Sequence, residues 1–230
     1  MKVLVINGSP RFEKSNSIKL ANAFINGLNE AEKNSIEKIN VYNKNIKPCQ
    51  GCFGCWKKTP GKCVISDDMD EIYIKYFDSE LIIWSFPLYY YGMPSQVKAL
   101  VDRLMPNNYP DIINDDGRAR HPQRHNKEKQ KHVLISTCGF FTVKYNYDAL
   151  VKQYEIMFGD RFIKILCPQG ELFNIPQLSA LTEKYLLNVT EAGKEYIKQG
   201  HFSENVLQKI NEPLFPAEQF IEMVNTFWKN

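Results

Sequence analysis

Two polar segments near the start of the chain contain residue types that bind anions. The first, Gly8 to Arg11, ends an apolar run, and the second, Ser15 to Ser17, precedes a predicted helix. A helix N-terminus offers unpaired N–H groups and a partial positive charge, which hydroxyl, amide and guanidinium groups can supplement. The candidate ligands are Ser9, Arg11, Ser15, Asn16 and Ser17. The sequence has neither a G-x-G-x-x-G fingerprint nor a Walker lysine, so the pattern favours a terminal phosphate over a pyrophosphate. The alternative is that Ser15 or Ser17 only caps the helix.

Four cysteines form a second group with chemical potential. Cys49, Cys52, Cys55 and Cys63 have the spacing C-x2-C-x2-C-x7-C. Two consecutive x2 gaps followed by a longer one are similar to the run that wraps an iron–sulfur cluster, whereas zinc ribbons usually show two separated pairs. The last gap is long and contains a Thr-Pro-Gly turn. The spacing therefore leaves four alternatives open: a 4Fe-4S cluster, free thiols or packing residues in a loop, a zinc site, or a regulatory disulfide.

These residues must be positioned by elements that alternate between strand and helix. Apolar, β-branched runs predict five strands, and segments with helical spacing follow the first four. The predicted strands are residues 2–7, 36–42, 81–86, 132–136 and 161–166, and the predicted helices are residues 17–29, 69–77, 94–105 and 146–158. This alternation implies right-handed βαβ units and a doubly wound α/β fold with a parallel sheet. Ligands of such sheets bind outside the carboxyl ends of the strands, so the loops after strands one, three and four are the candidate site.

The composition of the 230-residue chain is that of one large domain, or of one domain with an appendage. Its hydrophobic content of 43% and aromatic content of 13% exclude disorder. The formal net charge of +3 is too small to predict nucleic-acid binding, and no apolar run approaches the length of a membrane span. We therefore expect a cytoplasmic protein without nucleic-acid or membrane partners, whose cysteines stay reduced.

Three motifs, in this order, resemble the NADPH-dependent FMN reductase family of flavodoxin-like proteins. They are Asn7-Gly8-Ser9-Pro10-Arg11 with Ser15-Asn16-Ser17, then Pro87-Leu88-Tyr89-Tyr90-Tyr91-Gly92-Met93-Pro94-Ser95, then Lys98-Ala99-Leu100-Val101-Asp102-Arg103. The resemblance covers residues 1 to about 170. It implies a three-layer flavodoxin-like fold, with five parallel strands in the order 2-1-3-4-5, and bound FMN with its phosphate on the first loop.

The resemblance also implies which other residues contact the flavin. In the second loop these are Pro87, Leu88, Tyr89, Tyr90 and Met93, and in the third loop they are Thr137, Gly139 and Phe140. Backbone N–H groups would meet the polar edge of the flavin, and a tyrosine or methionine would cover its ring. The alternative for the second loop is that its tyrosines only pack. Cys138, in the third loop, is interpreted as a packed side chain.

In the family, FMN carries the hydride chemistry, so the resemblance requires no catalytic acid, base or nucleophile. It implies ping-pong reduction of a small acceptor, such as a flavin, quinone, nitro or azo compound, with NAD(P)H as co-substrate. Family members are often homodimers or homotetramers. The cysteine spacing also resembles that of iron–sulfur flavoproteins. The alternative function is thus an electron carrier with FMN plus a 4Fe-4S cluster on Cys49, Cys52, Cys55 and Cys63, whose partner is a redox protein.

Two segments stand apart from the predicted core. Residues 106–131 are a polar insertion in an FMN-binding domain of residues 1–175, and residues 176–230 form a helical extension packed on that domain or on a partner subunit. The insertion is expected to be a solvated segment. A second hypothesis makes it a lid over the flavin that selects NADPH through Arg118, Arg120 or Arg124.

Overall fold

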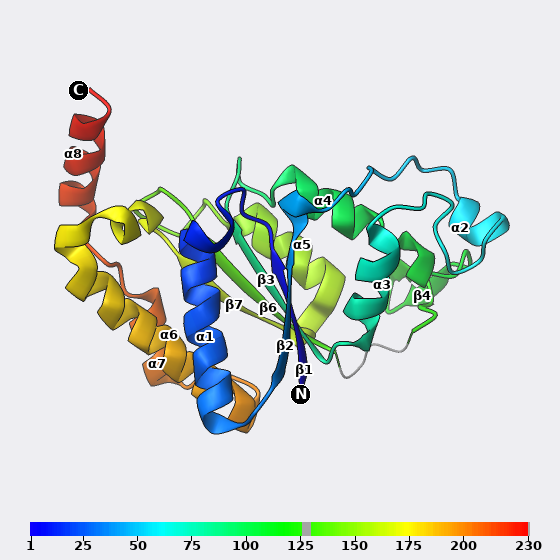
Figure 1. The fold of residues 1–230 in the computed structure, drawn as a ribbon, viewed down its shortest axis with the longest axis horizontal. Helices are drawn as coiled ribbons and strands as arrows, with labels where there is room; N and C mark the ends of the chain where they lie inside the picture. Colours follow the sequence, from blue (N-terminus) through cyan, green and yellow to red (C-terminus); the bar gives the residue numbers. More distant parts are fainter. Residues whose placement is uncertain (126–129, 230) are drawn as a thin grey trace.

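The computed structural model of the protein describes residues 1–125 and 130–229. Its centre is a parallel sheet of five strands in the order β2-β1-β3-β6-β7 (Figure 1). The strands are β1 (Lys2–Asn7), β2 (Ser35–Asn40), β3 (Leu81–Pro87), β6 (Lys131–Thr137) and β7 (Phe162–Cys167). Numbered along the chain without the small β4–β5 hairpin, this order is 2-1-3-4-5. The predicted fold class is therefore confirmed.

Helices cover both faces of the sheet, which makes three layers. One face is covered by α1 (Asn16–Ala31), α6 (Ser179–Gln199) and α7 (Glu204–Asn211), and the other by α3 (Met69–Asp78), α4 (Ser95–Asp102) and α5 (Asp148–Phe158). Strand β3 is continuously apolar because both of its faces are covered. Leu81 and Ile83 pack into the first core, whereas Ile82 and Trp84 pack into the second.

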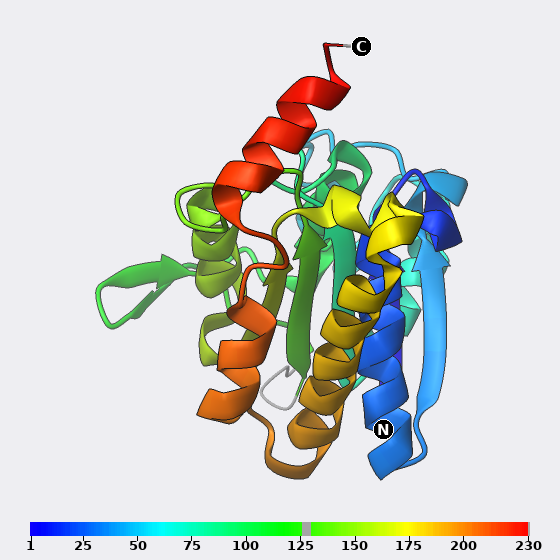
Figure 2. The ribbon, with the colours of Figure 1, turned by 90° about the vertical axis from the view of Figure 1, so that its left-hand side faces the viewer.

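Helix α6 lies directly against α1 (Figure 2). Two glycines permit this approach. A Cβ on Gly27 would lie 1.9 Å from the Thr190 carbonyl oxygen, and one on Gly193 would lie 2.1 Å from the Phe24 carbonyl oxygen. Because these contacts are with backbone, no side-chain movement could relieve them. The start of the helical C-terminal part is thus built into the layer that covers the sheet.

The last helix, α8 (Ala217–Phe227), differs from the others because it projects from the body of the protein (Figures 1 and 2). Within the described chain Phe220 is its one fully buried residue, whereas Phe227 and Trp228 are 70% and 79% exposed. The remaining α-helix, α2 (Gly54–Lys57), is a single turn in the loop between β2 and α3. Short 3-10 helices occupy Phe12–Lys14, Val41–Asn43, Met105–Asn107, Gly159–Arg161, Gly170–Asn174 and Pro176–Leu178. None of the described helices is long and apolar enough to cross a membrane.

The insertion contains structure that the sequence analysis missed. Strands β4 (Ile113–Asp115) and β5 (Arg118–Arg120) form an antiparallel hairpin. Asp116 and Gly117 connect them with φ values of 52° and 79°, the positive pair that a type I′ turn requires. An Asp-Gly pair is a typical hairpin signal, so the sequence contained the information. Each strand has three residues, which is too short for an alternation of apolar and polar residues to predict it.

Candidate functional site

The first candidate loop begins at the carboxyl end of β1 with two turns, each closed by a hydrogen bond from a backbone N–H to a side-chain oxygen two residues earlier. The Ser9 N–H donates to Asn7 Oδ1 at 3.1 Å, and the Arg11 N–H donates to Ser9 Oγ at 3.3 Å. Gly8 is needed here because a Cβ would lie 2.2 Å from Val97 Cγ2, on α4. The loop therefore curls tightly, close to the residues that follow β3. Ser9 is buried, whereas the Arg11 side chain is exposed at the rim.

The N-terminus of α1 gathers the remaining predicted residues of this loop. Ser15 Oγ accepts from the Ile18 N–H at 3.1 Å and lies 3.1 Å from Ser17 Oγ. Asn16 Nδ2 donates to the Gly170 carbonyl at 2.7 Å, but Asn16 Oδ1 is buried without a hydrogen-bond partner among the described residues. The first hydrogen bond of the helix runs from the Lys19 N–H to the Ser15 carbonyl. The N–H groups of Asn16 and Ser17 therefore take no part in the hydrogen bonds of the helix. Ser15 does cap the helix, as the alternative proposed, yet donors and one acceptor are left over.

The second loop is a tight turn with unusual residues at its centre. Tyr89 and Gly92 exchange two backbone hydrogen bonds of 3.0 Å, and the turn residues Tyr90 and Tyr91 have φ values of 47° and 65°. Positive φ is costly for residues other than glycine, about 1–3 kcal/mol each, and such strain clusters at functional sites. Tyr90 is 98% exposed. The turn thus presents aromatic rings outward rather than into the core.

The third loop is held against the second. The Leu88 N–H donates to the Thr137 carbonyl at 2.8 Å, and the Tyr91 ring stacks on the Phe140 ring with 5.9 Å between centroids and 12° between planes. Thr137 is buried, and Phe140 is half exposed. The space beside Gly139 is open, since a Cβ there would meet no atom within 4 Å. The backbone of the third loop is therefore accessible from outside at this position.

The structure brings the predicted flavin-loop residues to one edge of the sheet, at the carboxyl ends of β1, β3 and β6. They are Ser9, Arg11, Ser15, Asn16, Ser17, Pro87, Leu88, Tyr89, Tyr90, Met93, Thr137, Gly139 and Phe140. Tyr91 was absent from that prediction, although it forms the stack with Phe140. Gln169 was also missed. It is fully buried with a φ of 57°, and its N–H donates to the Phe140 carbonyl at 2.8 Å. No sequence signal marks a glutamine for such a position.

Cys138, in the third loop, is buried, and burial raises the pKa of its thiol. A protonated, enclosed thiol is a poor nucleophile. This environment agrees with the interpretation of Cys138 as a packed side chain.

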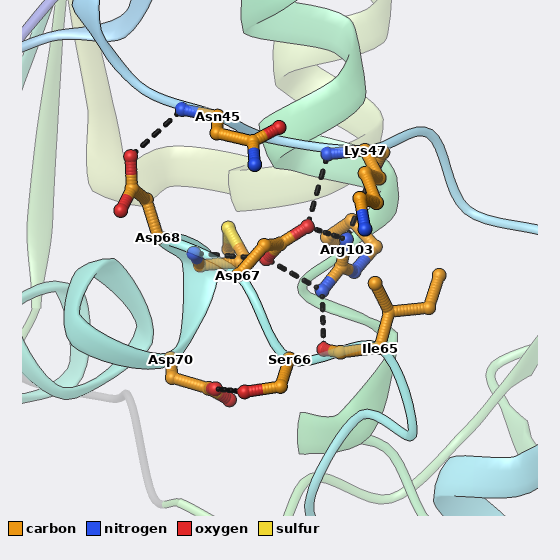
Figure 3. A network of polar contacts seen from close by, with 9 residues as sticks. Asn45, Lys47, Ile65, Ser66, Asp67, Asp68, Asp70 and Arg103 are labelled. Carbon is orange, nitrogen blue, oxygen red and sulfur yellow. Dashed lines mark hydrogen bonds and ion pairs between the residues drawn. The ribbon is translucent and has the colours of Figure 1, made fainter.

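The four clustered cysteines lie in a separate loop, between β2 and α3. Figure 3 shows the hydrogen bonds that tie the two ends of this loop together. At its base the Asn45 N–H donates to Asp68 Oδ2 at 2.7 Å, and the Lys47 N–H donates to Asp67 Oδ2 at 3.0 Å. We call residues 47–67 the cysteine loop. The carboxylates of these two aspartates thus bind the backbone of the incoming chain.

Asp67 also forms a buried ion pair with Arg103, at the end of α4 (Figure 3). The two distances are 2.8 Å from Nη1 to Oδ2 and 3.0 Å from Nη2 to Oδ1, and both side chains are almost completely buried. The guanidinium donates further to the Lys47 and Ile65 carbonyls. Burial raises the Asp67 pKa, but hydrogen bonds from Arg103, Lys47 and Met69 outweigh it and hold the pKa below its usual value. The carboxylate is thus charged at neutral pH, and the bidentate pair fixes the loop.

All four cysteines line one small cavity of about 110 Å³, together with Arg103. Cys49 and Cys52 are exposed, Cys63 is half-buried and Cys55 is buried. Burial raises the pKa of Cys55, as do the neighbouring thiol groups of Cys63, Cys49 and Cys52. Among residues 1–125 and 130–229, no three His, Cys, Asp or Glu side chains converge closely enough to ligate a single metal ion.

The insertion lies against the cysteine loop. The Trp56 ring is 5.0 Å from the His121 ring, and a Cβ on Gly61 would lie 3.4 Å from Arg124 Cδ. Arg118 donates to the Ile156 carbonyl at 2.6 Å, and Arg120 pairs with Asp115. The described arginines of the insertion thus contact α5, the hairpin and the cysteine loop. This placement differs from the second hypothesis, a lid over the flavin loops. Residues 126–129 of the insertion lie outside the described part.

Comparisons with known proteins agree with this geometry. The sequence model of a family described as flavodoxin-like fold matches residues 1–165. An iron–sulfur flavoprotein of Methanocaldococcus jannaschii is 42% identical over 106 residues, which are 46% of this chain and 53% of that protein. The chain thus spans about half the length of the iron–sulfur flavoproteins that it matches.

Two further relatives carry oxidoreductase names. An FMN-dependent NADH:quinone oxidoreductase of Pseudoalteromonas atlantica is 23% identical over 163 residues, covering 68% of this chain and 78% of that protein. The structure of an FMN-dependent NADH-azoreductase from Bacillus anthracis, in complex with FMN, superposes with a TM-score of 0.63 at 19% identity. It covers 86% of this chain and 100% of the azoreductase chain, which shows a shared fold.

Proposed function

The chain belongs to the flavodoxin-like fold family, which matches residues 1–165, and from this premise we propose that it is an FMN-dependent NAD(P)H oxidoreductase. The observation that carries the proposal is the unsatisfied polar set at the N-terminus of α1. Asn16 Oδ1 is buried without a partner among the described residues, and the N–H groups of Asn16 and Ser17 lie outside the helical ladder. A phosphate with adjoining hydroxyl groups has the acceptors and donors that this set lacks.

FMN, when bound, accepts a hydride from NAD(P)H and passes the electrons to an acceptor. The residues of the chain supply binding and orientation. Ser15, Asn16 and Ser17 would hold the phosphate, with Arg11 at the rim. The stacked rings of Tyr91 and Phe140 would form an apolar wall at the exposed end of the site. The open space beside Gly139 would let a flat ring approach the backbone.

We propose a small, flat acceptor, such as a quinone or an azo compound, with flavins and nitro compounds as further candidates. The names of the relatives, quinone oxidoreductase and azoreductase, support the first two. If the nicotinamide and the acceptor bind in turn at the same place beside Tyr91 and Phe140, the kinetics are ping-pong, and this is what we expect.

The experiment is an anaerobic titration of the FMN-loaded protein with NADH and, separately, NADPH, followed by addition of a benzoquinone. We expect the flavin absorbance at 450 nm to bleach and then return, and initial rates to give parallel double-reciprocal lines. Asn16→Asp places a negative charge at the phosphate and should abolish FMN binding. Asn22→Asp, on the exposed side of the same helix, is the matched control and should bind FMN normally. No FMN uptake by the wild-type protein would overturn the proposal.

A second candidate function is an iron–sulfur flavoprotein, an electron carrier that holds FMN and a 4Fe-4S cluster and exchanges electrons with another redox protein. The specific observation is that Cys49, Cys52, Cys55 and Cys63 line one cavity. The identity of 42% to an iron–sulfur flavoprotein supports it. Thiolates persist as ligands only where disulfides do not form, so we propose the cytoplasm as the compartment.

Iron and acid-labile sulfide, measured after anaerobic reconstitution, test this candidate. We expect four of each per chain in the wild-type protein and a severe loss in Cys52→Ala. Cys138→Ala removes a buried thiol outside the cysteine loop and should load normally. A wild-type protein that binds FMN but no iron would exclude the carrier and leave the reductase.

We also propose that the protein is a homodimer or homotetramer. Helix α8 projects from the body and exposes Phe227 and Trp228, apolar surface that a second copy could cover. Light scattering after gel filtration tests this, with a monomeric mass as the contradicting result.

A further inference from the structure

Four polar groups around the cysteine loop are buried without a hydrogen-bond partner in the part of the chain that the structure describes. They are Trp56 Nε1, Tyr73 Oη, Arg103 Nε and Arg124 Nε. Buried polar atoms are nearly always paired, so a concentration of unpaired ones needs an explanation. All four can donate a hydrogen. An acceptor beside the cysteines would account for those of the four that face them.

Arg103 lies beside the cysteines. It lines the cavity that all four cysteines share, and also a neighbouring cavity of about 280 Å³ that it shares with Cys63 and Tyr73. Its Nη1 and Nη2 atoms already donate to Asp67, Lys47 and Ile65. Nε is the remaining donor of this side chain. Burial lowers the pKa of the guanidinium, but the neighbouring Asp67 and Cys63 outweigh burial and raise it. The side chain is 1% exposed, so an acceptor for Nε has to lie inside one of these cavities.

Tyr73, on α3, offers a second donor. Burial raises its pKa to about 12, the Arg124 charge lowers it, and Cys55 raises it, which places the phenol within electrostatic reach of both residues. The hydroxyl therefore stays protonated at neutral pH and keeps its hydrogen to donate. Its ring packs against the Phe77 ring, with 4.4 Å between centroids, and lies edge-on to the His125 ring at 6.1 Å.

We propose that Arg103 Nε–H and Tyr73 O–H donate hydrogen bonds to the sulfur atoms of a 4Fe-4S cluster on Cys49, Cys52, Cys55 and Cys63, and that they raise its reduction potential. The inference rests on the second candidate function. Cluster and thiolate sulfurs carry negative charge that increases on reduction. Donors to these sulfurs stabilise the reduced form more than the oxidised form. Arg103 and Tyr73 are positioning and tuning residues here, not ligands.

The test compares Tyr73→Phe with Tyr154→Phe in the full-length, reconstituted protein. Tyr154 is the matched control because its hydroxyl is also buried without a partner in the described chain, but it packs in the core against Trp84 and Phe158. Both changes remove one oxygen and leave the ring. The readout is the midpoint potential of the cluster, from an anaerobic redox titration followed by electron paramagnetic resonance. We expect a lower potential in Tyr73→Phe, and the wild-type potential in Tyr154→Phe.

Arg103→Lys is the second variant, since it keeps a positive charge for Asp67 and removes the Nε donor. It should also lower the potential; if it fails to fold, Tyr73→Phe decides alone. Equal midpoint potentials in the wild-type protein and Tyr73→Phe, at equal iron content, would overturn the proposed hydrogen bonds to the cluster. They would not argue against the cluster itself. Absence of iron from a wild-type protein that binds FMN would overturn both, and would leave the flavin site untouched.

Discussion

The flavin loops and the cysteine loop are positioned by different means. The three flavin loops follow the neighbouring strands β1, β3 and β6 at the same edge of the sheet. Hydrogen bonds between backbone groups join them, such as the one from the Leu88 N–H to the Thr137 carbonyl. The cysteine loop leaves the edge strand β2 and has one helical turn of its own, α2. Its shape depends on side chains, above all on the buried pair of Asp67 and Arg103. A site held by the sheet should therefore tolerate single substitutions better than a site held by one ion pair.

Asp67→Ala tests this difference with the largest expected effect. It leaves the Arg103 guanidinium buried without its counter-ion, which typically costs about 3–5 kcal/mol of unfolding free energy. The control is Asp78→Ala, which removes an aspartate from an ion pair of the same length, 2.8 Å to Lys2, with both partners well exposed. The control should lose about 0–1 kcal/mol. Urea unfolding measures both.

Limited proteolysis and FMN titration of Asp67→Ala then separate the two regions. We expect cleavage within residues 47–67 while FMN affinity stays near that of the wild type. Equal stability losses in Asp67→Ala and Asp78→Ala would contradict the special role of the buried pair.

Gly8→Ala addresses the flavin edge. The new Cβ would lie 2.2 Å from Val97 Cγ2 and 3.0 Å from Phe86 Cβ. Overpacking of this kind costs about 1–3 kcal/mol, and displacement of the first loop should weaken FMN binding as well. Gly139→Ala, whose Cβ meets nothing within 4 Å, is the control for stability.

Val97→Ala should rescue part of the loss in a Gly8→Ala background, because it removes the atom in conflict. Unfolding free energies of the four proteins in this cycle measure the coupling. Purely additive losses would show that the clash with Val97 is not the cause.

The same contrast explains how much the sequence could predict. Strand positions and the flavin loops followed from apolar runs and from their order, since the carboxyl ends of parallel strands share one edge. The ion pair of Asp67 with Arg103 could not be predicted. It joins a loop to the end of a helix far along the chain, and the sequence around neither residue indicates its partner. The Tyr90–Tyr91 turn was missed for a related reason, because propensity disfavours positive φ for tyrosine.

Acid should loosen the cysteine loop with a smaller effect than Asp67→Ala. The folded pKa of Asp67 lies below its usual value, so its contribution to stability is complete above the unfolded pKa and is lost as pH falls through the folded pKa. The protonated carboxyl still accepts some hydrogen bonds, which limits the loss. We expect accessibility of residues 47–67 to protease to rise as the pH falls below the ordinary aspartate pKa of about 3.9, measured with an acid-active protease. Unchanged cleavage below that pH would contradict the expectation.

The smallest effect is expected for Ser17→Ala, at the flavin edge. The hydroxyl of Ser17 contacts Ser15 Oγ at 3.1 Å and has no role in the cap, which Ser15 provides to the Ile18 N–H. Its removal should lower the unfolding free energy by about 1 kcal/mol or less, through loss of the contact with Ser15. It should also cost one hydrogen bond to the phosphate, about 1 kcal/mol, or roughly a fivefold weaker FMN affinity. Ser95→Ala, an exposed serine at the start of α4, should bind FMN like the wild type. Fluorescence titration of FMN measures both variants. A loss of stability in Ser17→Ala without loss of affinity would mean that the buried hydroxyl serves the helix and not the ligand, and the sheet edge would then need a different account of its unpaired groups.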